Sequence, residues 1–574
     1  MQNMVSKATI KNWNRLGVNE EDQGDRLTSR ANKRLSKKNI LPLEYFTNKE
    51  NIKILTTIAD YIKENNINTH QVIYNLALNL LKQNNLSAKN KYISDILNDF
   101  EQKIDNFLID IELPFDEEDF LGIVYQYSQS EGDKNVKGSY YTPQKVIQKA
   151  IKKLDSDDIF LDPCCGTGSF ILQAAKRIKN PQNIYGCDID EIACFIAKIN
   201  LIIKYKNIEF CPNIYNANFL TQNTALKEQY FDVIATNPPW GALINKIVGK
   251  NFPNIKSGES FSYFIAQSKK YLKNDGKCSF ILPESILNVK AHQDIRKFIL
   301  DNFAIRKIEN LGKIFSGVLS DTVLLELDCK NNGIIELVEN GKTSQIEQKY
   351  YEFNNHNNFS FISSEEAKII DKIYSTDHET LINSTWGLGI VTGNNKKYLS
   401  FQKRATNEPI YTGKEICAYY LKPAANYIEY KRENFQQIAK DEIYRSEEKL
   451  VYKFISKKLI FAYDNKKSLF LNSANILIPN VNTHSTKTTL AFLNSKVFEF
   501  IYRKKFNELK ILKNNLSSLP FPKLSPTQKE ELERLVENYM KNNDKKILLE
   551  IDKFIFKCFN LTEQEIDLIN DFCN

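Results

Sequence analysis

The sequence contains few of the residues and patterns that would assign it to several common classes of protein. Its five histidines are scattered along 574 residues, and no pair among its ten cysteines has the spacing of a zinc finger. We therefore expect no metal site. Several cysteines lie inside apolar stretches, which favours reduced core residues over a disulfide framework.

Long apolar segments are also missing. No run approaches the roughly 20 apolar residues that cross a bilayer. Lys7 and Lys11, near the N-terminus, are not followed by the apolar stretch of a secretory signal. We therefore expect no contact with a membrane and a cytoplasmic location. The chain is too long for a single hydrophobic core, so several domains are expected.

Basic residues are concentrated in two segments, although the net charge of the whole chain is only +8. Residues 381–525 contain 24 Lys and Arg against 11 Asp and Glu, and residues 1–48 contain nine against five. Basic clusters neutralise phosphates, which supply most of the affinity for nucleic acids. A polyanion is the expected partner, and a lysine-rich surface that only maintains solubility is the alternative.

The residue patterns divide the chain into five segments. Residues 1–48 are basic, with a capped helix expected at 6–13, and residues 49–137 have helical apolar spacing. Residues 138–345 alternate short apolar runs with amphipathic helices, which predicts a Rossmann-like, doubly wound α/β domain. Residues 381–525 form a mixed α/β segment, and residues 526–574 form a helical tail.

Within the α/β segment, the first strong motif is a glycine turn. Buried strands are expected at residues 159–161, 184–187, 233–235 and 278–282, with helices at 170–178 and 191–203. After the first strand, Asp162 is followed by Gly166 and Gly168, which let the backbone approach a ligand at a helix N-terminus. Asp188, which ends the next strand, suits the two hydroxyls of a ribose. A Gly-x-Gly turn by itself says little, but the strand–turn–helix context and the acid that ends the next strand favour a nucleotide site.

The second motif is Asn237-Pro238-Pro239-Trp240, which a buried strand brings to the C-terminal edge of the sheet. The lone pair of adenine N6 is delocalised into the ring and attacks a sulfonium methyl poorly. The Asn237 side-chain oxygen and the Pro238 carbonyl can each accept one N6–H, which frees the lone pair for in-line attack. Trp240 offers a flat face for an extruded base. The alternative is a rigid turn without a catalytic role.

With the motifs in this order, residues 119–525 resemble the gamma group of amino-methyltransferases of bacterial restriction–modification systems, which includes TaqI-like, type I and type IIG enzymes. The resemblance implies transfer of a methyl group from S-adenosylmethionine to the N6 amine of a flipped adenine in a specific sequence of double-stranded DNA. It implies that the catalytic residues are Asn237, Pro238, Pro239 and Trp240. It also implies that the cofactor is bound by Tyr141, Thr142, Pro143, Asp162, Pro163, Cys164, Gly166, Gly168, Asp188, Ile189, Asn218 and Phe219.

Two positions differ from the residues usual in this family, and a third has two possible roles. Asn218 stands where the family often has Asp, so we expect weaker polarisation of the cofactor amine and no loss of binding. Trp240 replaces the usual Tyr or Phe, a change that preserves stacking. Residues 311–318 resemble the motif whose aromatic residue packs on the other face of the flipped base, which indicates Phe315; core packing is the alternative for this side chain.

The flanking segments suggest how DNA is recognised. Residues 387–522 resemble the target-recognition domain of TaqI-like enzymes, where lysines and arginines alternate with tyrosines suited to phosphate and base-edge contacts. Residues 6–13 faintly resemble the recognition helix of MerR-like helix–turn–helix modules. A separate restriction endonuclease or specificity partner is left open.

Other functions fit parts of this pattern. The Asn-Pro-Pro-aromatic motif also serves methyltransferases that act on RNA or on protein glutamine, but such enzymes seldom carry a long basic domain after the catalytic one. A non-catalytic, sequence-specific DNA-binding protein would not need the intact glycine turn. Glu429-Tyr430-Lys431 and Glu447-Glu448-Lys449 each match half of a nuclease pattern, without an upstream Asp on a strand.

Overall fold

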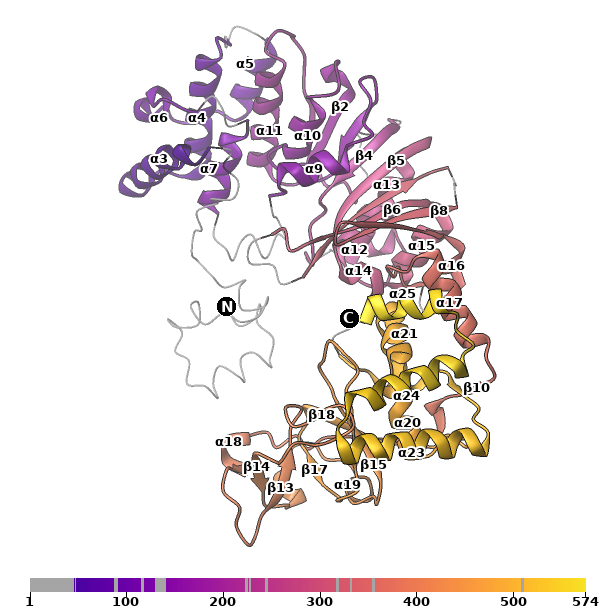
Figure 1. Cartoon of the computed structure of the whole chain (residues 1–574). Coiled ribbons are helices and arrows are strands. Elements are labelled where there is room, and N and C mark those ends of the chain that lie inside the picture. Colours follow the sequence, from indigo (N-terminus) through magenta and orange to yellow (C-terminus); the bar gives the residue numbers. More distant parts are fainter. Residues whose placement is uncertain are drawn as a thin grey trace. The chain divides into compact units, whose positions relative to one another are not determined.

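The chain folds into two compact units, residues 1–359 and 360–574 (Figure 1). The computed structural model describes residues 46, 48–86, 91–114, 118–129, 141–221, 226, 229–242, 246–315, 320–330, 333–353, 357–506 and 510–573. The helix expected at residues 6–13 lies outside these ranges. Within them, no helix is both long enough and apolar enough to cross a bilayer.

The first unit begins with a helical segment, as its apolar spacing predicts. Its helices are α3 (Ile52–Asn65), α4 (Thr69–Gln83), α5 (Lys91–Asp99), α6 (Asn106–Asp110) and α7 (Phe120–Ser128). Local signals set the helix starts: the side chain of Asn68 accepts a hydrogen bond from the backbone N–H of Gln71, and that of Asp119 does the same for Gly122. Buried apolar residues of α4 and α7 belong to the same core as those of α11 (Glu191–Lys204), so the segment is continuous with the next domain.

A nine-stranded sheet follows, with the order β3-β2-β1-β4-β5-β7-β6-β8-β9. Its strands are β1 (Phe160–Asp162), β2 (Ile184–Asp188), β3 (Asn213–Asn216), β4 (Phe231–Thr236), β5 (Leu272–Pro283), β6 (Ala304–Gly312), β7 (Thr322–Asp328), β8 (Ile334–Glu339) and β9 (Lys342–Glu347). Strands β1 to β5 pair in parallel, whereas β7 is antiparallel to both of its neighbours. The predicted doubly wound α/β fold is therefore confirmed.

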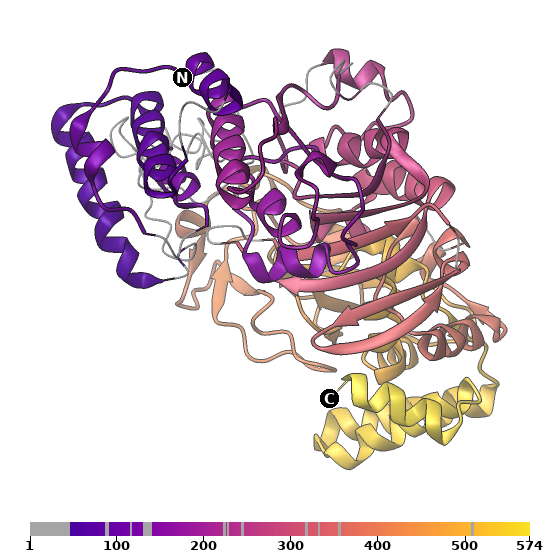
Figure 2. The same ribbon diagram turned by 90° about the horizontal axis from the view of Figure 1, so that it is seen from above.

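Helices pack on both faces of this sheet (Figures 1 and 2). The connections through α10 (Ser169–Ala174) and α11 lead from β1 to β2 and on to β3, towards one edge of the sheet. The connection through α13 (Ser260–Tyr271) leads from β4 to β5, in the opposite direction along the sheet. Because parallel crossovers are right-handed, helices that step in opposite directions lie on opposite faces. The remaining helices of the unit are α9 (Gln144–Ala150), α12 (Lys246–Lys250), α14 (Ser285–Asn288), α15 (Gln293–Asn302) and α16 (Lys349–Phe353). The chain order reverses between β1 and β4, the position where open α/β sheets bind ligands.

The second unit combines small sheets with a helical end. One sheet has the order β11-β18-β15-β16, the other β12-β14-β13-β17, and β10 pairs with β19. The strands are β10 (His378–Glu379), β11 (Thr385–Leu388), β12 (Leu399–Ser400), β13 (Glu408–Tyr411), β14 (Asn426–Ile428), β15 (Lys449–Lys453), β16 (Phe461–Asp464), β17 (Leu469–Phe470), β18 (Ala474–Ile478) and β19 (Phe521–Pro522). The helices are α17 (Ser364–Ser375), α18 (Asn395–Tyr398), α19 (Asp441–Tyr444), α20 (Thr486–Leu493), α21 (Lys496–Phe506), α22 (Lys513–Ser517), α23 (Pro526–Asn542), α24 (Lys545–Cys558) and α25 (Glu563–Cys573). The prediction of a C-terminal mixed α/β segment is confirmed, and helices α23, α24 and α25 follow it.

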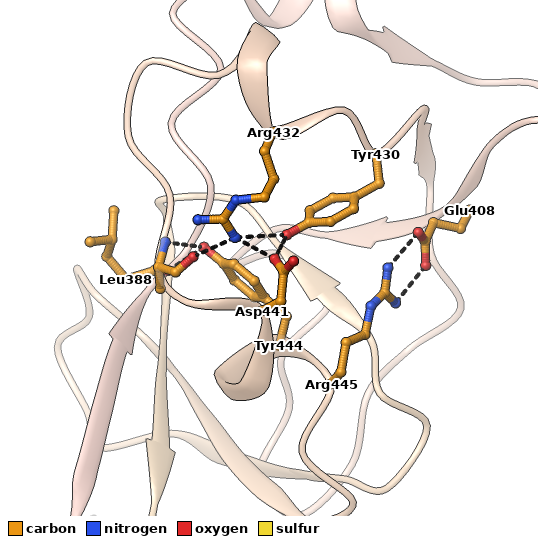
Figure 3. A network of polar contacts seen from close by, with 8 residues as sticks. Leu388, Glu408, Tyr430, Arg432, Asp441, Tyr444 and Arg445 are labelled. Atoms are coloured by element: carbon orange, nitrogen blue, oxygen red, sulfur yellow. Dashed lines mark hydrogen bonds and ion pairs between the residues drawn. The ribbon is translucent and has the colours of Figure 1, made fainter.

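Polar side chains tie the loops of the second unit to its sheets (Figure 3). Arg445 forms two hydrogen bonds to the carboxylate of Glu408, at 2.6 and 2.7 Å, and Arg432 pairs with Asp441, which also accepts the hydroxyl of Tyr430. The Glu-x-Lys tripeptides have structural partners as well. Lys431 pairs with its neighbour Glu429, and the Lys of the second tripeptide is buried in β15.

Breaking the buried ion pair between β15 and β16 should destabilise the second unit. Lys449 Nζ lies 2.6 Å from Asp464 Oδ2, and both side chains are at most 1% exposed. Replacing Lys449 with Met leaves the Asp464 carboxylate buried without its cation. We therefore expect the free energy of unfolding of the second unit to fall by about 3–5 kcal/mol, as measured by urea unfolding. The exposed pair Lys431–Glu429 provides the control, and Lys431→Met should leave the unfolding midpoint unchanged. Equal midpoints for the two variants would contradict this assignment.

Candidate cofactor and target-base site

The ends of four parallel strands bring the predicted site residues together. Asp162 of β1 lies beside Gly186 of β2, and Asp188 of β2 lies beside Asn216 of β3. On the other side of β1, strand β4 pairs in parallel and ends one residue before Asn237. Because carboxyl ends of parallel strands share one edge of a sheet, the glycine turn, the strand-end acids and the Asn-Pro-Pro turn meet there.

The glycine turn between β1 and α10 has the backbone geometry that its two glycines allow. Gly166 and Gly168 both have positive φ, 51° and 97°, a region that residues with a Cβ rarely adopt. A Cβ on Gly168 would lie 3.2 Å from that of Ala197 in α11, whereas a Cβ on Gly166 would meet no atom within 4 Å. The turn therefore packs closely against a helix on one side and faces open space on the other, as a turn that wraps a ligand must.

Asp162 joins β1 to β4 beneath this turn. Its Oδ1 accepts a hydrogen bond of 2.6 Å from Thr236 Oγ1 and one of 3.3 Å from the backbone N–H of Cys164. The carboxyl is 1% exposed, and burial raises its pKa to about 7. The Cys164 thiol lies 2.8 Å from Thr236 Oγ1 and 3.5 Å from the Asn237 carbonyl oxygen. The Asn-Pro-Pro turn therefore faces the glycine turn.

The second acid, Asp188, supports the turn from β2. Its Oδ2 accepts the backbone N–H of Gly166 at 2.9 Å, its Oδ1 accepts that of Asp190 at 2.9 Å, and burial raises its pKa. Each carboxylate oxygen has a second lone pair, so acceptor capacity for ribose hydroxyls is left. The next residue, Ile189, is 72% exposed although it is large and apolar. An acid beside an exposed apolar side chain can bind a nucleoside.

The structure separates the roles of Asn218 and Phe219, which the sequence grouped together. Asn218 Oδ1 accepts the backbone N–H of Leu220 at 3.0 Å, so its oxygen already stabilises a turn. The ring of Phe219 is 1% exposed and packs against Phe264. The carbonyl of Phe219 accepts a hydrogen bond of 3.2 Å from Gln267 Nε2.

The Asn-Pro-Pro-Trp turn is held by hydrogen bonds to three other segments, two through side chains and one through a backbone carbonyl. Asn237 Nδ2 donates to Thr142 Oγ1 at 3.1 Å, which links the turn to the segment 141–143. The hydroxyl of Ser260 in α13 donates to the Pro239 carbonyl, and Trp240 Nε1 donates to the Ile281 carbonyl of β5 at 3.2 Å. These contacts orient the asparagine amide and fix the backbone around it.

The two aromatic candidates for base stacking contact each other directly. The ring centroids of Trp240 and Phe315 are 5.2 Å apart, with an interplanar angle of 86°, and the residues are 5% and 7% exposed. In this arrangement the rings do not form a parallel pair with space between them. A base that packs flat on Trp240 must meet Phe315 at its edge or displace it.

Sequence motifs did not indicate the residues that support the turn from behind. Asp119 accepts the Thr167 hydroxyl and an amide hydrogen of Asn200, each at 2.7 Å. The helix cap formed by Asp119 was the one available signal, and it predicts only a helix start. Within the described ranges, no group of three or more His, Cys, Asp or Glu side chains is placed to hold a metal ion.

Fold and site together define a class of protein. Methyltransferases that use S-adenosylmethionine and act on planar amines share four features with this chain. These are the strand order with one antiparallel β7, the glycine turn after β1, the acid after β2 and the Asn-Pro-Pro-Trp turn after β4.

Two family models match the chain. The model described as N-6 DNA Methylase matches residues 116–408, and the model described as TaqI-like C-terminal specificity domain matches residues 408–521. Type II methyltransferase M.VspI of Vibrio sp. (strain 343) is 34% identical over 312 residues, which cover 52% of this chain and 74% of M.VspI. Type I restriction enzyme EcoEI methylase subunit of Escherichia coli is 27% identical over 165 residues, which cover 26% of this chain and 33% of that subunit.

Solved structures agree with this fold. The type IIL restriction–modification enzyme MmeI, solved in complex with DNA, has a TM-score of 0.58 at 14% identity, covering 92% of this chain and 93% of MmeI. The chain belongs to the N-6 DNA methylase family. It is a site-specific, adenine-N6 DNA methyltransferase of the restriction–modification type. The comparisons therefore favour DNA as the substrate over the alternatives, RNA and protein glutamine.

The buried carboxyl of Asp162 predicts a dependence of stability on pH. Its pKa of about 7 in the folded chain, against 3.8 ordinarily, means that folding retains a proton there. The stability from this group is complete below pH about 4, declines as the pH rises and levels off above pH about 7. Between pH 5 and 8, wild type should lose on the order of 2 kcal/mol relative to Asp162→Asn in urea unfolding. Asp301→Asn, at an exposed ion pair with Lys297, serves as control; a difference between wild type and Asp162→Asn that is constant with pH would disprove the assignment.

Proposed function

We propose that Asn237 and Pro238 hold the target amine through two carbonyl oxygens. Asn237 Nδ2 is engaged by Thr142, which turns Oδ1 to the other side of the amide. The Pro239 carbonyl accepts from Ser260, whereas no residue in the described ranges donates to the Pro238 carbonyl. The two oxygens can therefore each accept one N6–H of adenine, which draws the nitrogen lone pair out of conjugation with the ring.

The methyl transfer then needs positioning and no strong base. When bound, S-adenosylmethionine supplies an electrophilic methyl group on a sulfonium. The Asn237 and Pro238 oxygens would direct the N6 lone pair at that methyl group, and the proton that N6 loses on methylation would pass to solvent. We infer that the Asn-Pro-Pro turn would present the amine towards the glycine turn, because Cys164 Sγ lies 3.5 Å from the backbone carbonyl oxygen of Asn237.

The cofactor site that we propose runs along the strand ends. The methionine part would lie against the turn from Asp162 to Gly168 and near Tyr141, Thr142 and Pro143. The ribose would bind Asp188, and the adenine would pack on Ile189, whose exposure supports this role. Asn218 would accept from the adenine amine through its second lone pair, with Phe219 contributing backbone only.

We propose further that the second unit reads the DNA and that Trp240 stacks on the extruded adenine, with Phe315 at the edge of the base. The match to a TaqI-like specificity domain and the excess of basic residues over 381–525 support the first point. Because this chain carries its own specificity domain, we infer that it selects its target without a separate specificity subunit.

The two-carbonyl mechanism predicts a selective loss of catalysis. Asn237→Ala removes one acceptor, so methyl transfer to duplex DNA should fall by about 10²–10³-fold or more. Transfer is measured with radiolabelled S-adenosylmethionine, and binding of cofactor and DNA by calorimetry. The cofactor and DNA affinities should change little, because neither depends on that oxygen. Full turnover by Asn237→Ala would refute the mechanism.

DNA binding by the basic segment should depend steeply on salt. Lys403 and Arg404 lie in an exposed loop of the second unit. If both contact phosphates, Lys403→Ala/Arg404→Ala should reduce the slope of log Kobs against log salt concentration by roughly two. Lys541→Ala, in helix α23 outside the basic segment, is the control. An unchanged slope in the double variant would remove this loop from the DNA interface.

A further inference from the structure

Helix α7 contacts the glycine turn through its capping residue, although it belongs to the N-terminal helical segment. Its capping residue Asp119 is 4% exposed and accepts the Thr167 hydroxyl at 2.7 Å through Oδ2. The other oxygen accepts the backbone N–H of Gly122 and an amide hydrogen of Asn200. Asn200 also donates to the Thr167 carbonyl at 3.2 Å. Thr167 is thus held at both its hydroxyl and its backbone.

A second contact of the same helix reaches the loop after β2. The hydroxyl of Tyr125, two turns after the cap, donates to Asp190 Oδ2 at 2.7 Å. Asp190 in turn donates its backbone N–H to Asp188, and its side chain caps α11 by accepting the N–H of Ala193. One helix therefore supports the two loops that the cofactor is proposed to contact.

The anchoring of Thr167 matters because its neighbours are both glycines. Gly166 and Gly168 have the largest backbone freedom of any residue type, so an unanchored turn would lose much conformational entropy when a ligand binds. Holding the hydroxyl and the carbonyl of Thr167 restricts this freedom before binding. Burial raises the pKa of the Asp119 carboxyl to about 7, because its charged form is unfavourable away from water. The three hydrogen-bond donors around it offset part of this cost.

We propose that Asp119 and Tyr125 are positioning residues for the methyl donor: they pre-organise the glycine turn through Thr167 and the loop after β2 through Asp190, so that the N-terminal helical segment sets the cofactor affinity. This inference rests on the proposed cofactor site. It makes α7 part of the functional unit, in addition to its packing against α4 and α11.

The same helix start offers a matched control. Glu118, the neighbour of Asp119, pairs with Lys176 at 2.6 Å and Lys204 at 2.8 Å, and all three side chains are partly exposed. These ion pairs attach the start of α7 to the ends of neighbouring helices and contact neither cofactor loop. Glu118→Gln should therefore weaken the docking of α7 without changing the turn.

The test compares four full-length variants. Thr167→Val keeps the shape of the side chain and removes the hydroxyl, Thr167→Ser restores it, and Tyr125→Phe removes the second contact. Cofactor affinity is measured by calorimetry with S-adenosylmethionine alone, and steady-state kinetics give KM for cofactor and for DNA separately. Thermal unfolding of each variant, Glu118→Gln included, reports stability.

We expect Thr167→Val and Tyr125→Phe to raise the dissociation constant and KM for S-adenosylmethionine roughly tenfold, the effect of one lost buried hydrogen bond. For Tyr125→Phe, the KM for DNA and kcat at saturating cofactor should stay within about twofold, and Thr167→Ser should restore the cofactor affinity lost in Thr167→Val. Glu118→Gln should lower the unfolding temperature at unchanged cofactor affinity. If the Val and Phe variants bind the cofactor like wild type, or if Glu118→Gln weakens binding equally, the inference is wrong. Failure of wild type to bind the cofactor would instead refute the proposed site.

Discussion

The hydrogen bond between Thr236 and Asp162 is the contact on which the site depends. It joins the ends of two neighbouring parallel strands, β1 and β4, at 2.6 Å and out of contact with solvent. The segments that follow these strands are the glycine turn and the Asn-Pro-Pro-Trp turn. Holding the two strand ends together keeps the carbonyl oxygens of one turn beside the ligand-facing backbone of the other.

This construction explains why the sequence needs so few of the usual catalytic residue types. In the mechanism that we propose, a planar amine becomes nucleophilic when two fixed acceptors take its hydrogens, and these acceptors would be the Asn237 amide and the Pro238 backbone carbonyl. Neither titrates near neutral pH, so no histidine or metal ion has to be placed beside them. The two acceptors must instead be held in a fixed orientation. Thr142, Ser260 and the hydrogen bond from the Trp240 indole to β5 provide this orientation.

The two units differ in how they use charge. In the first unit, the carboxyls of the site are buried and bound by backbone and hydroxyl donors, as at Asp162 and Asp188. In the second unit, arginines such as Arg445 are held by carboxylates within a segment that is basic overall. A buried site held by fixed hydrogen-bond donors suits a reaction governed by positioning, whereas a basic surface suits the recognition of a polyanion.

Much of the fold could be read from local patterns. Short apolar runs that end in Asp162, Asp188 or Asn237 indicated parallel strands because buried strands lack alternation, and the structure has strands that end at or next to these residues. The order of the motifs along the chain was enough to indicate the family that the comparisons show. Helix starts at Asp119, Asp190 and Ser525 follow from capping residues, which act within one turn of their own helix.

Other features were decided only by packing between distant segments. The ring of Phe219 points into the core, Trp240 meets Phe315 edge to face, and Asp119 reaches Thr167 and Asn200 across 48 and 81 residues of sequence. The one-dimensional order of residues sets which backbone conformations and which strand ends are available. Which side chains then meet depends on how helices and strands pack in three dimensions, since contacts over such separations are formed by the whole core and have no local pattern.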